Sequence, residues 1–379
     1  MRLHRFAAVL AGALSVTMLA PAVANAAPMS NRPWVTVIAS RLDNPRGVSV
    51  GDDGTVVVAE AGRGGKSDKC VESPEAGKVC LGYTGAITAV TAGQRGTWRQ
   101  RRFVGGLPSL AGSDGSSAVG PHDVSPYAGG GYVATLGLGG TTQTRLSLGF
   151  GGLMLGQTIV VNRDGNNSLS LRTLGDPAAF EARRDPDQQG VDSNPYGVLG
   201  TRGGAVATDA GGNTLVSIDR KGAVATLAVF PNRMVPSPEP GGGRVPMQAV
   251  PTSVVRGPDG AYYVGQLTGF PFPSGGANVY RVVPGQRPTI FARGFTNIID
   301  LAFDQQGRLL VLEIAKNSLL SDDQTGALIR VDRRGRRTEL VPGRLTAPGG
   351  LAVGADGSLF VTNRSVVAGR GELLRIGNG

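Results

Sequence analysis

A pattern that recurs six times limits this chain to one kind of fold. Each copy has an entry that usually contains proline, a short apolar strand, a glycine turn, and a second apolar strand that ends in a polar residue. Such repeats indicate a chain built from similar supersecondary units that pack side by side. The copies begin at Asn44-Pro45, Gly120-Pro121, Asn194-Pro195, Val250-Pro251, Asn297 and Ala347-Pro348.

Each repeat leaves room for two more strands before the next one begins. Turn glycines in the later repeats lie about fifty residues apart, which suits a four-stranded blade. The 60 glycines and 24 prolines leave little length for long helices. We therefore expect an all-β fold for residues 27–379: a six-bladed β-propeller with four-stranded blades. The N-terminal strand Trp34 to Ala39 would complete the last blade and close the ring, which removes the exposed sheet edge.

The first 26 residues have the features of a signal peptide. A positive start precedes the uncharged run Phe6 to Ala20, and Ala24-Asn25-Ala26 is a small-x-small cleavage site. We expect export and a mature chain that starts near Ala27, secreted or associated with the cell envelope. An uncleaved anchor is the alternative. No later segment approaches the roughly 20 apolar residues of a membrane-spanning helix.

The two cysteines, Cys70 and Cys80, lie in one short segment. In an oxidising compartment this spacing predicts a disulfide that closes a loop. The alternative is half of a metal site, but only His122 remains as a histidine after residue 26, so a zinc site of the usual Cys and His type is not expected.

The net charge of +10 does not indicate a nucleic-acid-binding protein, because aromatic residues make up 5% of the chain and no basic stretch is interleaved with them. Attraction to anionic envelope polymers or lipid headgroups is one interpretation. A general preference for arginine in the composition is the other. We expect a monomer whose partner is a small molecule or a cell-envelope component.

Polar residues are predicted to surround one mouth of the central channel. The first strand of a repeat enters, and the second leaves, at the same end of their hairpin. Long insertions at 62–84, 137–156, 175–193, 231–249 and 267–277 should gather at this face, as binding loops on a rigid scaffold do. Solvated loop residues would produce the same polar pattern. The candidate ligand-binding residues are Glu60, His122, Asn194, Tyr196, Asp209, Asn297, Asp300, Glu313 and Asn363.

Two kinds of chemistry are candidates at this mouth. His122 and Asp123 are candidate catalytic residues, because a histidine near a carboxylate can act as a general base. A hydrogen bond from His122 to a neighbouring blade is the alternative, since adjacent residues of a strand point to opposite faces. Oxygen ligands that converge on an axis suit Ca²⁺ or Mg²⁺. The candidate metal ligands are Glu60, Asp209, Glu313 and Asn363.

The sequence resembles the ScyD/ScyE proteins, exported relatives of the NHL and SMP-30/strictosidine-synthase-like propellers. The resemblance rests on the segments Gly120 to Val124 and Asp192 to Val198, together with the Pro-x-Gly and Asp-Gly repeats. It implies a six-bladed propeller outside the cytoplasm and no established reaction. Our first hypothesis is therefore a binding or scaffold protein that uses the channel mouth. The alternative is a metal-assisted hydrolase or lyase of the lactonase type.

Overall fold

The structure is a computed structural model that describes residues 33–379, apart from residues 74–76, 129, 164–167 and 378–379. The predicted signal peptide, residues 1–26, lies outside the described residues. In the part of the chain that is described, no helix is long and apolar enough to cross a membrane.

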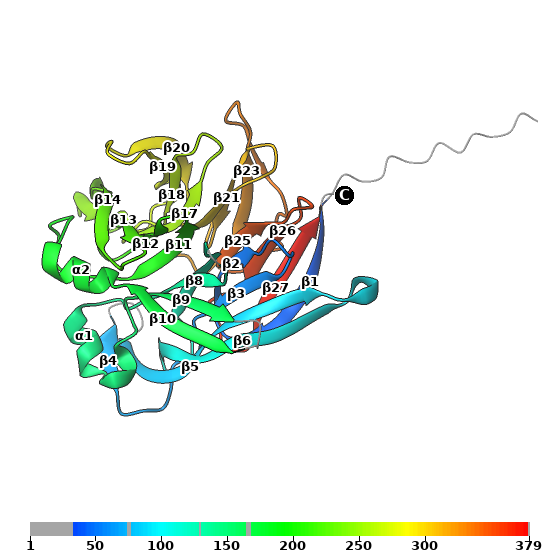
Figure 1. Ribbon diagram of the computed structural model, residues 1–379. Coiled ribbons are helices and arrows are strands. Elements are labelled where there is room, and N and C mark those ends of the chain that lie inside the picture. The colour runs from blue at the N-terminus through cyan, green and yellow to red at the C-terminus, as the bar shows by residue number, and fades with distance from the viewer. Residues whose placement is uncertain (1–32, 74–76, 129, 164–167, 378–379) are drawn as a thin grey trace, which may run out of the picture.

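Six antiparallel sheets stand in a ring, so the predicted six-bladed β-propeller is confirmed (Figure 1). The first strand of each blade is innermost and contacts the first strand of the next blade around the ring. From blade 1 to blade 6 these strands are β2 (Pro45–Val50), β7 (Pro121–Pro126), β11 (Pro195–Thr201), β17 (Pro251–Arg256), β21 (Ile298–Phe303) and β25 (Gly350–Val353).

The other strands of each blade follow outward from the channel. The second strands are β3 (Val56–Glu60), β8 (Tyr132–Leu136), β12 (Gly204–Asp209), β18 (Tyr262–Gln266), β22 (Leu309–Glu313) and β26 (Leu359–Asn363). The third strands are β5 (Gly77–Ala92), β9 (Thr158–Arg163), β13 (Thr214–Asp219), β19 (Ala277–Val282), β23 (Ala327–Val331) and β27 (Gly371–Gly377). The outermost strands are β6 (Trp98–Ala111), β10 (Leu169–Gly175), β14 (Val224–Val229), β20 (Thr289–Phe295), β24 (Arg337–Glu339) and β1 (Trp34–Leu42).

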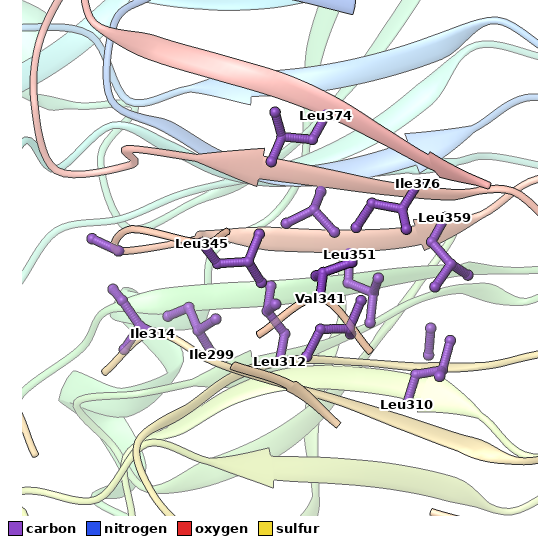
Figure 2. Packing of buried hydrophobic residues seen from close by; sticks show 14 of the residues in the cluster. Ile299, Leu310, Leu312, Ile314, Val341, Leu345, Leu351, Leu359, Leu374 and Ile376 are labelled. Carbon is purple, nitrogen blue, oxygen red and sulfur yellow. The ribbon is translucent and has the colours of Figure 1, made fainter. Parts of the chain in front are cut away.

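The second strands are apolar because both of their faces pack against neighbouring blades. In β22 all five residues are buried, and the four before the terminal Glu313 form a continuous apolar run rather than an alternating one. Figure 2 shows one such packing layer, in which Leu310 and Leu312 of blade 5 face Leu351 and Leu374 of blade 6. The core is therefore a series of layers between blades.

Four of the five predicted insertions contain regular structure that the sequence did not indicate. Local contacts explain it: in residues 175–193, for example, the Asp176 side chain accepts a hydrogen bond from the N–H of Ala179 and caps a helix that starts with Pro177. A short 3₁₀ turn, η1 (Gln94–Gly96), lies outside the insertions, between β5 and β6. The insertions hold β4 (Cys70–Ser73), α1 (Thr142–Ser147), the 3₁₀ turn η2 (Phe150–Gly152), α2 (Pro177–Arg184), β15 (Arg233–Pro236) and β16 (Arg244–Met247).

The predicted disulfide is confirmed, because Cys70 and Cys80 are bonded across the pair formed by β4 and the start of β5. This pair extends blade 1 beyond its four main strands.

The N-terminal strand closes the ring, as predicted. β1 pairs with β27, the third strand of blade 6, from Trp34 opposite Gly377 to Leu42 opposite Gly371. Ile38 is 7% exposed and packs in the cluster that contains Phe360 and Leu373, whereas its neighbour Val37 is 50% exposed. The closing strand is thus held by backbone pairing and by one buried face.

We predict that Ile38→Ala lowers the free energy of unfolding by about 2–4 kcal/mol, because it leaves a cavity under the closing strand. Val37→Ala on the same strand should change it by less than about 0.5 kcal/mol. Urea denaturation of both variants checks this. Equal effects of the two changes would show that β1 does not bury its inner face against blade 6.

Candidate functional site

A repeated contact, which we call the mouth clamp, holds the two strands of each hairpin together at the channel mouth. In all six blades, a backbone N–H just beyond the second strand donates to the carbonyl of the residue just before the proline, or the equivalent position, of the first strand. The donor directly follows the second strand in blades 1 to 5 and lies two residues beyond it in blade 6. The six pairs are Ala61 to Asn44, Gly137 to Gly120, Ala210 to Asn194, Leu267 to Val250, Ile314 to Asn297 and Ser365 to Ala347.

The predicted polar ring belongs to this mouth clamp. Its four candidate metal ligands are at most 4% exposed. Each accepts a hydrogen bond from a backbone N–H at the entry to its own blade, so a polar side chain is required at this position to pair a buried donor. The bonds are Asp43 N to Glu60 (2.7 Å), Asn194 N to Asp209 (2.7 Å), Thr296 N to Glu313 (2.7 Å) and Thr346 N to Asn363 (2.8 Å).

The carboxylates of the mouth clamp are engaged separately in their own blades. Glu60 also accepts hydrogen bonds from the Arg102 guanidinium, at 3.1 Å, and from the hydroxyl of Thr88. Burial raises the pKa of Glu313 to about 7 and that of Asp209 to about 6. Among the described residues, these carboxylates do not form a group of three whose oxygens all lie within 4.8 Å of one another. The structure therefore gives no cluster at the positions predicted to bind a metal.

The predicted asparagines connect neighbouring loops at the mouth. The Asn297 side chain donates to the Leu267 carbonyl at 2.9 Å, and Asn194 accepts from the Leu138 N–H at 3.1 Å. Both contacts reach the loop that follows the second strand of the preceding blade. The two amides thus tie adjacent blades together at the mouth.

His122 is held between two blades. Its Nδ1 lies 3.1 Å from the carbonyl oxygen of Pro195, and because that oxygen can only accept, Nδ1 carries the proton in this contact. The imidazole ring lies 4.5 Å from the ring of Tyr196, centroid to centroid. A Cβ atom at Gly137 would come within 2.1 Å of this imidazole, so only glycine fits there. Burial, together with the charge of Arg46, lowers the pKa of His122 to about 3.

Asp123 does not orient His122. Its two oxygens accept from the N–H groups of Val124 and, in the next blade, Val198, each at 2.8 Å. Asp300 repeats this arrangement in blade 5 with Leu301 and Leu351 at 2.7 Å. Gly47 leaves room for Asp123, since a Cβ there would lie 1.9 Å from its oxygen.

Asp123 and Asp300 sit at equivalent positions on opposite sides of the six-bladed ring, and both are partly exposed on innermost strands. They therefore line the channel. Burial raises the pKa of Asp123 to about 7. Burial and the charge of Asp123 raise the pKa of Asp300 well above its usual range. The channel consequently disfavours two negative charges at once.

Several side chains of the innermost strands have buried polar atoms without a hydrogen-bond partner, among them Arg46, Tyr196 and Ser253. Arg46 and Tyr196 are the two largest of these. They occupy the same position in blades 1 and 3 that His122 occupies in blade 2. One Arg46 nitrogen donates to the Ala118 carbonyl at 2.9 Å, but Nε is buried without a partner, and so is the Tyr196 hydroxyl. Burial raises the pKa of Tyr196, which the charge of the neighbouring Arg46 and a weak contact between the two side chains oppose. That contact does not have the geometry of a hydrogen bond. The sequence places both residues at the entry side of the mouth, but only Tyr196 was included among the candidate ligand-binding residues.

Sequence analysis also missed an acidic cluster beside α2. Glu181, Asp185 and Asp187 each offer an oxygen within 4.8 Å of the others. All three residues come from the insertion 175–193, whose helix was not predicted, so nothing in the repeat pattern brought them together.

No protein-family model and no curated protein matches this chain. Among solved structures, it is similar to one described as glucose dehydrogenase with a TM-score of 0.53 and 15% identity, covering 92% of this chain and 100% of that one. A second glucose dehydrogenase gives 0.52 and 13% with the same coverage. A streptogramin B lyase gives 0.49 and 11%, covering 91% and 98%. At these identities the likeness shows the propeller fold alone.

We predict that His122 stays neutral throughout the physiological range, with a pKa near 3. Its folded pKa lies below the unfolded value of about 6.5, so stability from this group is present above pH 6.5 and falls as the pH drops toward 3. His122 is the one histidine after residue 26, so the imidazole NMR signal of the mature protein is unambiguous. A titration midpoint near 6.5 would contradict the buried contact with Pro195.

Proposed function

We propose that this protein is an exported binding protein that holds a small polar molecule at the channel mouth. Arg46 and Tyr196 would donate hydrogen bonds to an oxygen-bearing group of the ligand, such as a carboxylate or a carbonyl. His122 would pack beside the ligand, since its ring lies against Tyr196.

The observation that carries this proposal is the pair of unpartnered polar atoms, Arg46 Nε and Tyr196 Oη. Leaving a buried donor unpaired costs about 1–3 kcal/mol. The mouth clamp shows that the same fold satisfies other buried groups at this face with short hydrogen bonds. A ligand that pairs these two atoms would recover the cost, and this favours binding over a purely structural role for the channel.

Export is supported by two observations. The bond between Cys70 and Cys80 is typical of proteins that fold in oxidising compartments. Residues 1–26 have the pattern of a signal peptide. We also propose that this propeller is related to the ScyD/ScyE proteins. The segments around Gly120 and Asp192 support this relationship. An envelope component is the second class of partner.

The alternative is a metal-assisted hydrolase or lyase of the lactonase type. It would use His122 or the pair Asp123 and Asp300, with a metal on the polar ring. To bind a metal, Glu60 would have to give up contacts to Asp43, Thr88 and Arg102. A His122 pKa near 3 also makes it a weak general base near neutral pH. These two costs favour a binding protein over a metal-assisted enzyme.

We predict that Tyr196→Phe weakens ligand binding at least about tenfold, the effect of one lost hydrogen bond. The same change should leave the free energy of unfolding unchanged or higher by up to about 1 kcal/mol, because it removes an unpaired buried hydroxyl. A thermal-shift screen of the mature protein with lactones, sugar acids and short carboxylates would identify ligands. Calorimetry on the best compound gives the affinities.

Tyr132→Phe is the matched control, since Tyr132 begins β8 at the end of blade 2 away from the mouth. It should bind the compound like the wild type. Equal binding by Tyr196→Phe and the wild type would refute the proposed site. Turnover of a lactone that stops on metal removal would favour the enzyme instead.

A further inference from the structure

Three carboxylates converge where α2 ends, before the chain enters blade 3. Asp185 caps the C-terminal end of α2, and its backbone N–H donates to the carbonyl of Glu181. Asp185 then adopts a left-handed conformation, φ 39°, and the chain turns so that Asp187 returns to the same spot. One oxygen from each residue lies within 4.8 Å of the other two.

Glu181 gives an independent sign that something is bound there. It is 1% exposed, and its Oε1 is buried without any hydrogen-bond partner. Its other oxygen lies against Gly212, where a Cβ would come within 2.6 Å. Burying a carboxylate is costly unless an opposite charge or hydrogen bonds compensate. None of the ion pairs found among the described residues includes Glu181, Asp185 or Asp187.

The surroundings add negative charge rather than compensating it. Asp209 and Asp192 also lie close enough to Glu181 to act on its charge, in addition to Asp185 and Asp187. Asp185 Oδ1 is likewise buried without a partner. Two buried carboxylate oxygens of the cluster are thus left without a hydrogen-bond partner, in a group of acids without an ion-pair partner among the described residues.

We propose that Glu181, Asp185 and Asp187 bind one Ca²⁺ ion. Calcium takes oxygen ligands at about 2.3–2.6 Å, so one ion can bridge oxygens up to roughly 5 Å apart. Magnesium, at about 2.0–2.1 Å, spans a shorter distance and demands near-ideal octahedral geometry, which suits this cluster less well. The site is separate from the mouth clamp residues predicted to bind a metal, and the inference does not rest on the proposed function.

The ion would stabilise the rim of blade 3. Asp187 accepts from the Gln189 N–H at 3.0 Å and from the Asn213 side chain at 2.8 Å. Asn213 in turn accepts from the Val250 N–H at the entry to blade 4, at 3.0 Å. Fixing Asp187 would therefore also hold Asn213, whose side chain links blade 3 to the start of blade 4.

The test is calcium binding to the mature protein after treatment with EDTA and dialysis. Isothermal titration calorimetry should give one Ca²⁺ per chain. Calcium at about 100 times its Kd should raise the Tm by about 3–6 °C. Glu181→Gln and Asp185→Asn should each weaken binding at least tenfold and remove the Tm shift. Without calcium, Glu181→Gln should melt no lower than the wild type, because the amide relieves the repulsion.

Glu313→Gln is the matched control, because Glu313 is equally buried and also has a raised pKa, yet belongs to the mouth clamp. It should bind calcium like the wild type. The absence of both heat and Tm shift in the wild type would overturn the proposal. So would loss of binding in Glu313→Gln with binding kept in Glu181→Gln. If Glu181→Gln fails to fold, the more exposed Asp185→Asn decides.

Discussion

The mouth clamp is the contact on which the rest of this structure depends. A propeller brings the entry of each first strand and the exit of each second strand to the same buried place, and the backbone groups there need partners. The clamp supplies them with one backbone bond in every blade and, in four blades, with a buried acid or amide. Glu60, Asp209, Glu313 and Asn363 therefore have a structural role at the mouth face, whatever else they do.

The channel residues discussed above lie two and three positions beyond the mouth-clamp carbonyls on the innermost strands. Arg46, His122 and Tyr196 share one position, and Asp123 and Asp300 share the next. The carboxylates tie neighbouring blades together, and His122 does the same. Arg46 Nε and Tyr196 Oη are not used in this way. In this account, most of the channel side chains stabilise the fold. Ligand recognition depends on the few whose polar atoms have no hydrogen-bond partner within the protein.

The fold could be predicted from the sequence because a buried strand repeated six times leaves few alternatives. The closing strand and the pair Cys70 and Cys80 followed from the same reasoning. The direction in which the polar ring residues point could not be predicted. A residue such as Glu313 occupies the same place at the end of its strand whether its side chain points into the channel or toward the backbone of its own blade. The acidic cluster was also out of reach, because Glu181 and Asp187 meet only through the capped helix α2, and the repeats carry no information about insertions.

A crystal structure of the mature protein with the compound that stabilises it most is the most direct test of the central claim. The account predicts density at the channel mouth within hydrogen-bond distance of Arg46 Nε and Tyr196 Oη, with the mouth clamp bonds of Glu60 and Glu313 intact. A compound bound to Glu60 and Glu313 with those bonds broken, or bound away from the channel, would contradict it.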